Sequence, residues 1–137
     1  TVFLLIFSSC KNHEENTTLE NFNGDRTTFS KTLANKILMA QKVGGSYKLS
    51  STEALPVMVK SLSENVQKQS YAKIKALFGD YKGLEFHSIK EIVKGETYEI
   101  YRFKGDFEFN SETEVRVVLN KEGKLSGFFV KPWNNSL

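Results

Sequence analysis

The spacing of apolar residues changes once along this chain, close to Tyr81, and this change limits the possible folds more than any other feature. Before Tyr81 the apolar residues recur every three or four positions, whereas after it they recur every second position. The first spacing is typical of helices that bury one face, and the second is typical of strands. The sequence therefore predicts helices first and strands second.

The first predicted helix begins near Thr28 and ends before Gly44, where glycine favours a helix C-terminus. Gly79 is expected to end the third helix in the same way. Spacings of three and four place the apolar side chains of the first helix on one stripe. Its members are Phe29, Leu33, Ala34, Ile37, Leu38 and Ala40.

Two further helices are expected before the strands. Ser51 or Thr52 is predicted to cap a short helix, in which Pro56 is tolerated because it falls in the first turn. The third helix is predicted to begin near Ser61 or Ser63, and Ser61 with Glu64 three residues later has the form of a capping box.

The second half of the chain predicts four strands, of which the second is the clearest. Tyr101, Phe103, Phe107 and Phe109 occupy odd positions, and charged residues occupy the even positions between them. The first strand contains a break in its alternation near Ile89, which predicts a bulge or a bend. The predicted strands cover residues 84–93, 101–109, 114–119 and 124–131.

The turns between these strands are short, and short turns favour an antiparallel meander. Helices that precede such a sheet cover one of its faces. The fold class expected is therefore α+β, with N-terminal helices packed on a bent, four-stranded antiparallel sheet in a cone-like arrangement. Residues 27–137 are predicted to form this single domain.

A different signal lies near the N-terminus. The apolar run Val2–Phe7 is followed by two serines and by Cys10, which is the only cysteine in the chain. The run is too short to cross a bilayer but fits the end of a signal peptide. This arrangement resembles the lipobox of a bacterial lipoprotein. The resemblance implies that residues 1–9 belong to a truncated signal peptide and that Cys10 carries the acyl chains of a membrane anchor.

Residues 10–26 then form the lipidated cysteine and a flexible tether, because this stretch is polar and has few groups to bury. The predicted location is the bacterial cell envelope, on the periplasmic side of a membrane or at the cell surface. The alternative is a cytosolic protein with an exposed apolar N-terminus and a spare thiol at Cys10.

Four segments of the predicted domain carry a family resemblance: Gln69–Tyr71, Leu77–Tyr81, Tyr101–Gly105 and Lys124–Phe129. They resemble a bacterial domain-of-unknown-function family that occurs alone in lipoproteins and also in front of α/β-hydrolase domains. The order of elements resembles the nuclear transport factor-like, cone-shaped α+β folds. These resemblances imply a fold in which a bent sheet wraps around a long helix, and they imply no catalytic residue.

The charge of the chain argues against a nucleic-acid partner. The formal net charge is only +3, whereas nucleic-acid-binding domains are strongly basic. Nine lysines but three acidic residues lie between Lys31 and Lys82, and such an excess is typical of the solvated faces of helices. The partners that remain are the membrane, reached through Cys10, and an apolar small molecule or a protein.

Motifs for catalysis are scarce. The sequence contains no Gly-x-Ser-x-Gly elbow and no P-loop, and its two histidines and one cysteine predict neither a metal site nor a cofactor. His87 is the sole histidine of the predicted domain, and a small cone-fold enzyme that uses His87 or a buried carboxylate as general acid or base is the alternative function. The carboxylates of the strand region alternate outward like a solvated face. They are Glu96, Glu99, Asp106, Glu108, Glu112 and Glu114.

The aromatic row suggests a binding function without catalysis. Gly105 interrupts this row, and a glycine inside a strand marks a bend or a close approach of another group. We expect a pocket at the mouth of the cone for an apolar ligand or a partner segment. Alternatively, the same rings simply fill the core. The candidate lining residues are Tyr101, Phe103, Phe107, Phe128 and Trp133.

Overall fold

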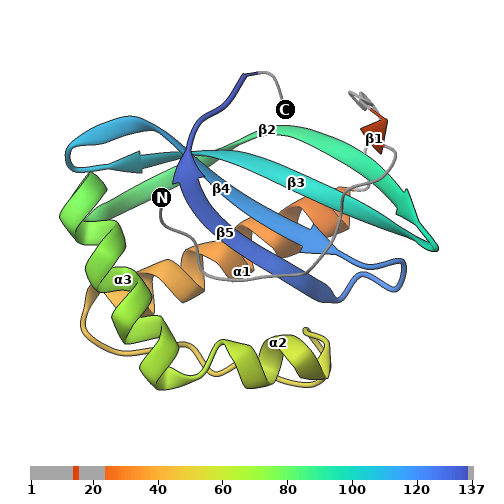
Figure 1. The fold of residues 1–137 in the computed structure, drawn as a ribbon, viewed down its shortest axis with the longest axis horizontal. Coiled ribbons are helices and arrows are strands. Elements are labelled where there is room, and N and C mark those ends of the chain that lie inside the picture. The colour runs from red at the N-terminus through yellow and green to blue at the C-terminus, as the bar shows by residue number, and fades with distance from the viewer. Residues whose placement is uncertain (1–13, 16–23, 136–137) are drawn as a thin grey trace.

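The computed structural model describes residues 14–15 and 24–135, so Cys10 and the predicted signal peptide lie outside the described residues. The helices precede the long strands, as the change in apolar spacing predicts (Figure 1). In chain order the elements are β1 (Glu14–Glu15), α1 (Gly24–Lys42), α2 (Pro56–Ser61), α3 (Glu64–Phe78), β2 (Tyr81–Lys94), β3 (Glu96–Phe107), β4 (Asn110–Leu119) and β5 (Leu125–Pro132).

Helix α1 begins at Gly24, earlier than its apolar stripe predicts, so residues 24–26 are helical rather than part of a flexible tether. Arg26 explains the longer helix, because it ties the first turn to the sheet. Its Nη1 donates to Glu99 Oε1 at 2.9 Å, and its Nη2 donates to the Lys121 carbonyl at 2.8 Å. Asp25 also suits this first turn, because a carboxylate is favourable near a helix N-terminus.

The predicted caps of the other two helices are partly confirmed. Pro56 is the first residue of α2, as predicted, but its N-cap is Leu55 and no side chain caps it, so the prediction of a Ser51 or Thr52 cap is wrong. Ser63, one of the two predicted positions, is the N-cap of α3, because its hydroxyl accepts a hydrogen bond from the Val66 amide at 3.3 Å. The predicted capping box of Ser61 and Glu64 is wrong, since Ser61 is the last residue of α2. Gly79 is confirmed as the C-cap of α3, with a φ of 84° that favours glycine.

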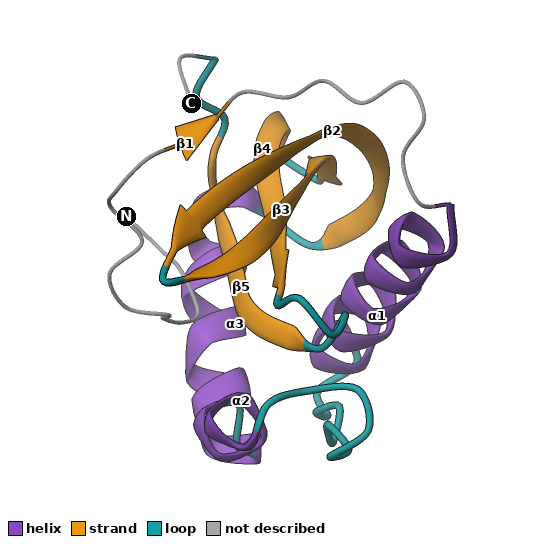
Figure 2. Ribbon diagram, turned by 90° about the vertical axis from the view of Figure 1, so that its right-hand side faces the viewer, coloured by secondary structure: helices purple, strands orange, loops and turns teal. Residues whose placement is uncertain are grey.

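The sheet has the order β1-β2-β3-β4-β5 with antiparallel neighbours, and its four long strands form the predicted meander. The sheet does not close. The predicted irregularity in the first long strand is confirmed by a register shift between Phe86 and Ser88. Strand β2 also curls strongly along its length (Figure 2). The second long strand ends at Phe107, so Phe109 lies in the following turn, where 70% of its surface is exposed.

The main core lies between the helices and one face of the sheet, which we call the inner face (Figure 2). Alternation along β3, β4 and β5 directs Phe103, Val115 and Val130 into this core from adjacent strands. The opposite, outer face buries a smaller cluster of Ile92, Ile100 and Val118. Apolar burial at about 25 cal/mol per Å² makes the inner face the main source of stability.

Candidate functional site

The structure does not bring the five predicted pocket residues together around one cavity. Tyr101, Phe103, Phe107 and Phe128 lie on the inner face with at most 2% of their surface exposed. Their rings pack as core. The Phe107 ring lies 5.8 Å from that of Phe78 and 5.5 Å from that of Tyr81, and the Phe103 ring lies 5.9 Å from that of Phe86.

Gly105 has a packing role within this core. A Cβ atom at Gly105 would lie 2.9 Å from Phe107 Cε1 and 3.1 Å from Val115 Cγ2, and both distances are too short for ordinary contact. The register also shifts between Gly105 and Phe107. The prediction of a close approach at this glycine is therefore confirmed, and the approaching group is a core ring.

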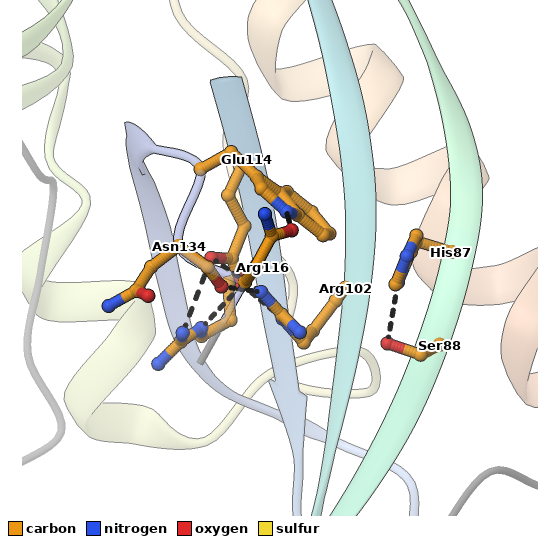
Figure 3. A network of polar contacts seen from close by, with 8 residues as sticks. His87, Ser88, Arg102, Glu114, Arg116 and Asn134 are labelled. Carbon is orange, nitrogen blue, oxygen red and sulfur yellow. Dashed lines mark hydrogen bonds and ion pairs between the residues drawn. The ribbon is translucent and has the colours of Figure 1, made fainter. Parts of the chain in front are cut away.

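The outer face carries a buried charged network around Glu114 (Figure 3). Glu96, Asp106, Glu108 and Glu112 are exposed, as the sequence predicts, whereas Glu99 is half-buried between Arg26 and the Tyr101 hydroxyl. Glu114 has 0% of its surface exposed, so its predicted place on a solvated face is wrong. Its carboxylate accepts hydrogen bonds from Arg102 Nε and Arg116 Nε, both at 2.9 Å. Arg102 and Arg116 stand directly opposite in the β3–β4 register, where like charges repel, and Glu114 between them offsets that repulsion.

These contacts set the ionisation of Glu114. Burial alone would raise the pKa of its carboxyl, but the hydrogen bonds and positive charges of Arg102 and Arg116 outweigh burial and hold that pKa below its usual range. Glu114 is therefore ionised at neutral pH. A carboxylate fixed in this way acts as a structural counterion.

Trp133 lies on this outer face, against side chains from β2 and β3. The Arg102 guanidinium carbon is 4.2 Å from the centre of the indole, the Lys104 Nζ is 4.6 Å from it, and the His87 ring centre is 4.6 Å away. Arg102 Nη2 also donates to the Asn134 carbonyl at 2.8 Å, so the network holds the segment after β5 (Figure 3). Burial and the charges of Arg102 and Lys104 lower the pKa of His87, although Glu114 acts in the opposite direction.

An open groove of about 390 Å³ runs beside α1, and we call it the α1 groove. Tyr47 and Glu53, from the connector between α1 and α2, form its second wall. Positions three and four apart on a helix share one face, which explains how a single helix supplies the first wall. The α1 residues that line the groove are Asp25, Thr28, Phe29, Thr32, Leu33 and Lys36.

The polar wall of the α1 groove is internally hydrogen-bonded. The Tyr47 hydroxyl donates to Glu53, at 2.9 Å from Oε1 and 3.2 Å from Oε2, and the Ser50 amide donates to Oε1 at 3.2 Å. Burial and the neighbouring Glu53 carboxylate raise the pKa of Tyr47, so the phenol keeps its proton at neutral pH. The wall therefore presents a carboxylate whose orientation is fixed by a phenol and an amide.

A buried glutamine positions this wall, and sequence reasoning missed it. The Gln67 side chain, 1% exposed, accepts from the Tyr47 amide at 3.0 Å and donates to the carbonyls of Tyr47 and Leu62, both at 2.8 Å. Gln41 of α1 donates to the same Gln67 oxygen at 3.1 Å. A glutamine within the apolar positions of α3 was the only signal available for this contact.

Two other hollows are more polar or smaller. One of about 440 Å³ is lined by residues at the ends of β2 and β3, among them Glu85, Lys104 and Asp106. Another of about 300 Å³ is also lined by Tyr47 and lies next to Leu62 and Glu64. His87 lines none of these three hollows of the described region.

No family model, curated protein or solved structure matches this chain. Within residues 14–15 and 24–135 no three histidine, cysteine, aspartate or glutamate side chains gather closely enough to hold a metal ion. The helices of this described part are also too short or too polar to cross a membrane.

Proposed function

We propose that this protein is a noncatalytic binding module, tethered to a membrane of the bacterial cell envelope through Cys10, whose apolar ligand or partner segment occupies the α1 groove. The groove is the observation that carries this proposal. Its volume of about 390 Å³ falls in the range of small-molecule sites, roughly 300–1,000 Å³. Its lining combines the apolar side chains of Phe29 and Leu33 with polar side chains, and hydrogen bonds orient two of the polar groups, Tyr47 and Glu53. Oriented polar groups beside apolar side chains are also found in ligand sites.

The walls of the groove are formed before any ligand arrives, which favours binding. Gln67 fixes the backbone of Tyr47, and Tyr47 in turn fixes the Glu53 carboxylate. A preformed site loses less conformational entropy when a ligand binds.

The charged groups elsewhere support binding over acid–base catalysis. A general base works best when its pKa lies near the working pH. The pKa of the buried Glu114 carboxyl is instead shifted downward, away from neutral pH. His87 packs against Trp133 and donates to or accepts from the Ser88 hydroxyl at 2.9 Å, outside the α1 groove.

The tether and the groove are tested separately. For the tether, cells that express the protein are labelled with radioactive palmitate, and we expect label on the wild type but none on Cys10→Ala. An unlabelled wild type would contradict the anchor.

For the groove, a library of small fragments is screened by amide chemical-shift perturbation on the full chain in mild detergent. We expect the hits to perturb α1 and the Tyr47–Glu53 connector, and Thr32→Trp, which fills the groove from an exposed position, to abolish them. Ser111→Trp is the matched control, because it fills the hollow beside Lys104 instead. Hits that survive Thr32→Trp, or no hits at all, would overturn the proposal.

A further inference from the structure

The charges that line the α1 groove differ in sign from the chain as a whole. The chain has a formal net charge of +3, but the groove presents the carboxylates of Asp25 and Glu53 and one ammonium, that of Lys36. Asp25 and Lys36 are eleven positions apart on α1, which is about 16 Å along a helix, so they lie toward opposite ends. Phe29 and Leu33 lie between them and give the groove an apolar floor.

The Glu53 carboxylate retains acceptor capacity. Its Oε1 accepts from Tyr47 and Ser50, whereas its Oε2 accepts only the longer, 3.2 Å bond from Tyr47 in the described region. An ionised carboxylate offers about four lone-pair sites, so Glu53 can accept at least one more hydrogen bond. A group that donates without accepting, such as an ammonium, is complementary to this position.

Two aromatic side chains, Phe29 and Tyr47, line the groove. The Tyr47 hydroxyl donates to Glu53, which places the carboxylate at the hydroxyl edge of this ring and not over its face. A cation–π contact needs the cation over the face, so the choice of a cation rests on Glu53. The aromatic rings favour the apolar body of the same ligand.

From these contacts, and resting on the proposed function, we infer that the α1 groove binds a small organic ammonium with an apolar aryl or alkyl body. The ammonium donates to Glu53, and the body packs on Phe29 and Leu33. A carboxylate ligand of the same shape is repelled by Glu53, whose orientation is fixed by Tyr47 and Ser50. The groove thus selects ligands by the sign of their charge.

The test compares three probes of the same shape: 2-phenylethylamine, neutral 2-phenylethanol and anionic 3-phenylpropanoate. Titrations of the full chain in mild detergent, followed by amide chemical shifts, are expected to give the tightest binding for the amine and the weakest for the carboxylate. Glu53→Gln keeps an acceptor for Tyr47 but removes the charge. We expect it to weaken amine binding about tenfold, the loss of one half-buried charge-assisted hydrogen bond, and to weaken alcohol binding much less, because a neutral hydroxyl can still donate to the amide oxygen.

Glu64→Gln is the matched control, because Glu64 is exposed and lines the 300 Å³ hollow but not the α1 groove. It should leave all three affinities unchanged. Equal binding of the amine and the carboxylate, or amine binding that is insensitive to Glu53→Gln, would overturn the ammonium inference while the groove remains a binding site. No binding of any probe at α1, combined with no fragment hits there, would overturn the proposed function as well.

Discussion

The inner and outer faces of the sheet bury side chains of opposite kinds. The inner face packs rings and branched aliphatic chains against the helices, and residues such as Phe103 and Phe128 are fully enclosed. The outer face has no described helix over it, yet it encloses Glu114 and nearly all of Arg102. Enclosure on the inner face comes from packed layers, whereas enclosure on the outer face comes from an ion network that the segment after β5 completes.

The two kinds of burial differ in what they contribute. Apolar burial is favourable by itself, in proportion to the area removed from water. A buried ion network gains little over an apolar replacement, but removal of one partner is costly because a charge is left without compensation. We therefore expect the inner face to supply stability and the outer face to fix the position of the C-terminal segment.

The largest effect is expected on the inner face. Phe103→Ala should lower the free energy of unfolding by about 4 kcal/mol, because it removes a fully enclosed ring and leaves a cavity among neighbours that cannot collapse. Urea unfolding followed by circular dichroism measures the change. Phe109→Ala is the control, since Phe109 is 70% exposed and its loss should cost less than about 0.5 kcal/mol. Similar losses of unfolding free energy in the two variants would mean that the inner face is not the main source of stability.

The next effect belongs to the outer face. Glu114→Gln should lower the free energy of unfolding by about 3 kcal/mol at pH 7, because two guanidinium groups lose their counterion in a buried site. Since the pKa of Glu114 is lowered in the folded state, the wild type should lose stability as the pH falls below about 4.5. This loss should be smaller in the variant.

A second variant compares an exposed carboxylate of the outer face with the buried one. Glu112→Gln removes an exposed carboxylate that contacts Lys104 at 3.2 Å, and exposed pairs contribute at most about 1 kcal/mol. If Glu112→Gln and Glu114→Gln had equal effects, or if acid sensitivity persisted fully in Glu114→Gln, the outer-face network would not be the buried ion site described above.

The inner face could largely be predicted from the sequence, because its buried residues recur at the spacings typical of strands and helices. Alternation placed Tyr101, Phe103 and Phe107 on one face, and the helical stripe of α1 identified its buried positions. The outer face could not be predicted, because a charged residue at an even position has the same pattern whether it is solvated or enclosed. Only the register, which sets Arg102 opposite Arg116, shows that Glu114 has two cations to compensate.

The spacing of apolar residues in the sequence also could not predict the α1 groove. Phe29 and Leu33 were recognised as part of a helical stripe, but the second wall depends on how the connector folds back along α1. That path is set by the contacts of Gln67 with Tyr47, which join segments 20 residues apart in sequence. Local propensity carries no information about such a contact.

A smaller effect should follow from the aromatic part of the outer face. Trp133→Ala is expected to cost about 1 kcal/mol, because one partly exposed ring loses its contacts with Arg102 and Lys104. Trp133→Phe keeps a ring in place and should recover about half of that loss. Urea unfolding of both variants, followed by circular dichroism, checks the order. A loss in Trp133→Ala as large as that of Phe103→Ala would mean that the outer face packs as a second core.

The smallest effect concerns the pH dependence that His87 adds to the outer face. Burial and the charges of Arg102 and Lys104 lower the pKa of His87 below 6.5, so the unfolded chain binds a proton more readily than the folded one. Stability contributed by neutral His87 is therefore complete above pH 6.5 and decreases as the pH falls from 6.5 toward the lowered value. Urea unfolding at pH 5.5 and pH 7.5 should show this decrease in the wild type and a weaker one in His87→Gln.

Direct titration makes the comparison independent of unfolding. The ring proton shifts of His87 should follow a pKa below 6.5, and Lys104→Met should raise that pKa because it removes one of the two cations. The matched control is Lys82→Met, at an exposed position of β2 with no charge contribution to His87. A pKa at or above 6.5 in the wild type, or equal shifts in both lysine variants, would mean that the cations around Trp133 do not act on His87. The outer face would then hold its C-terminal segment through the Arg102–Asn134 hydrogen bond and the indole contacts, without electrostatic coupling to His87.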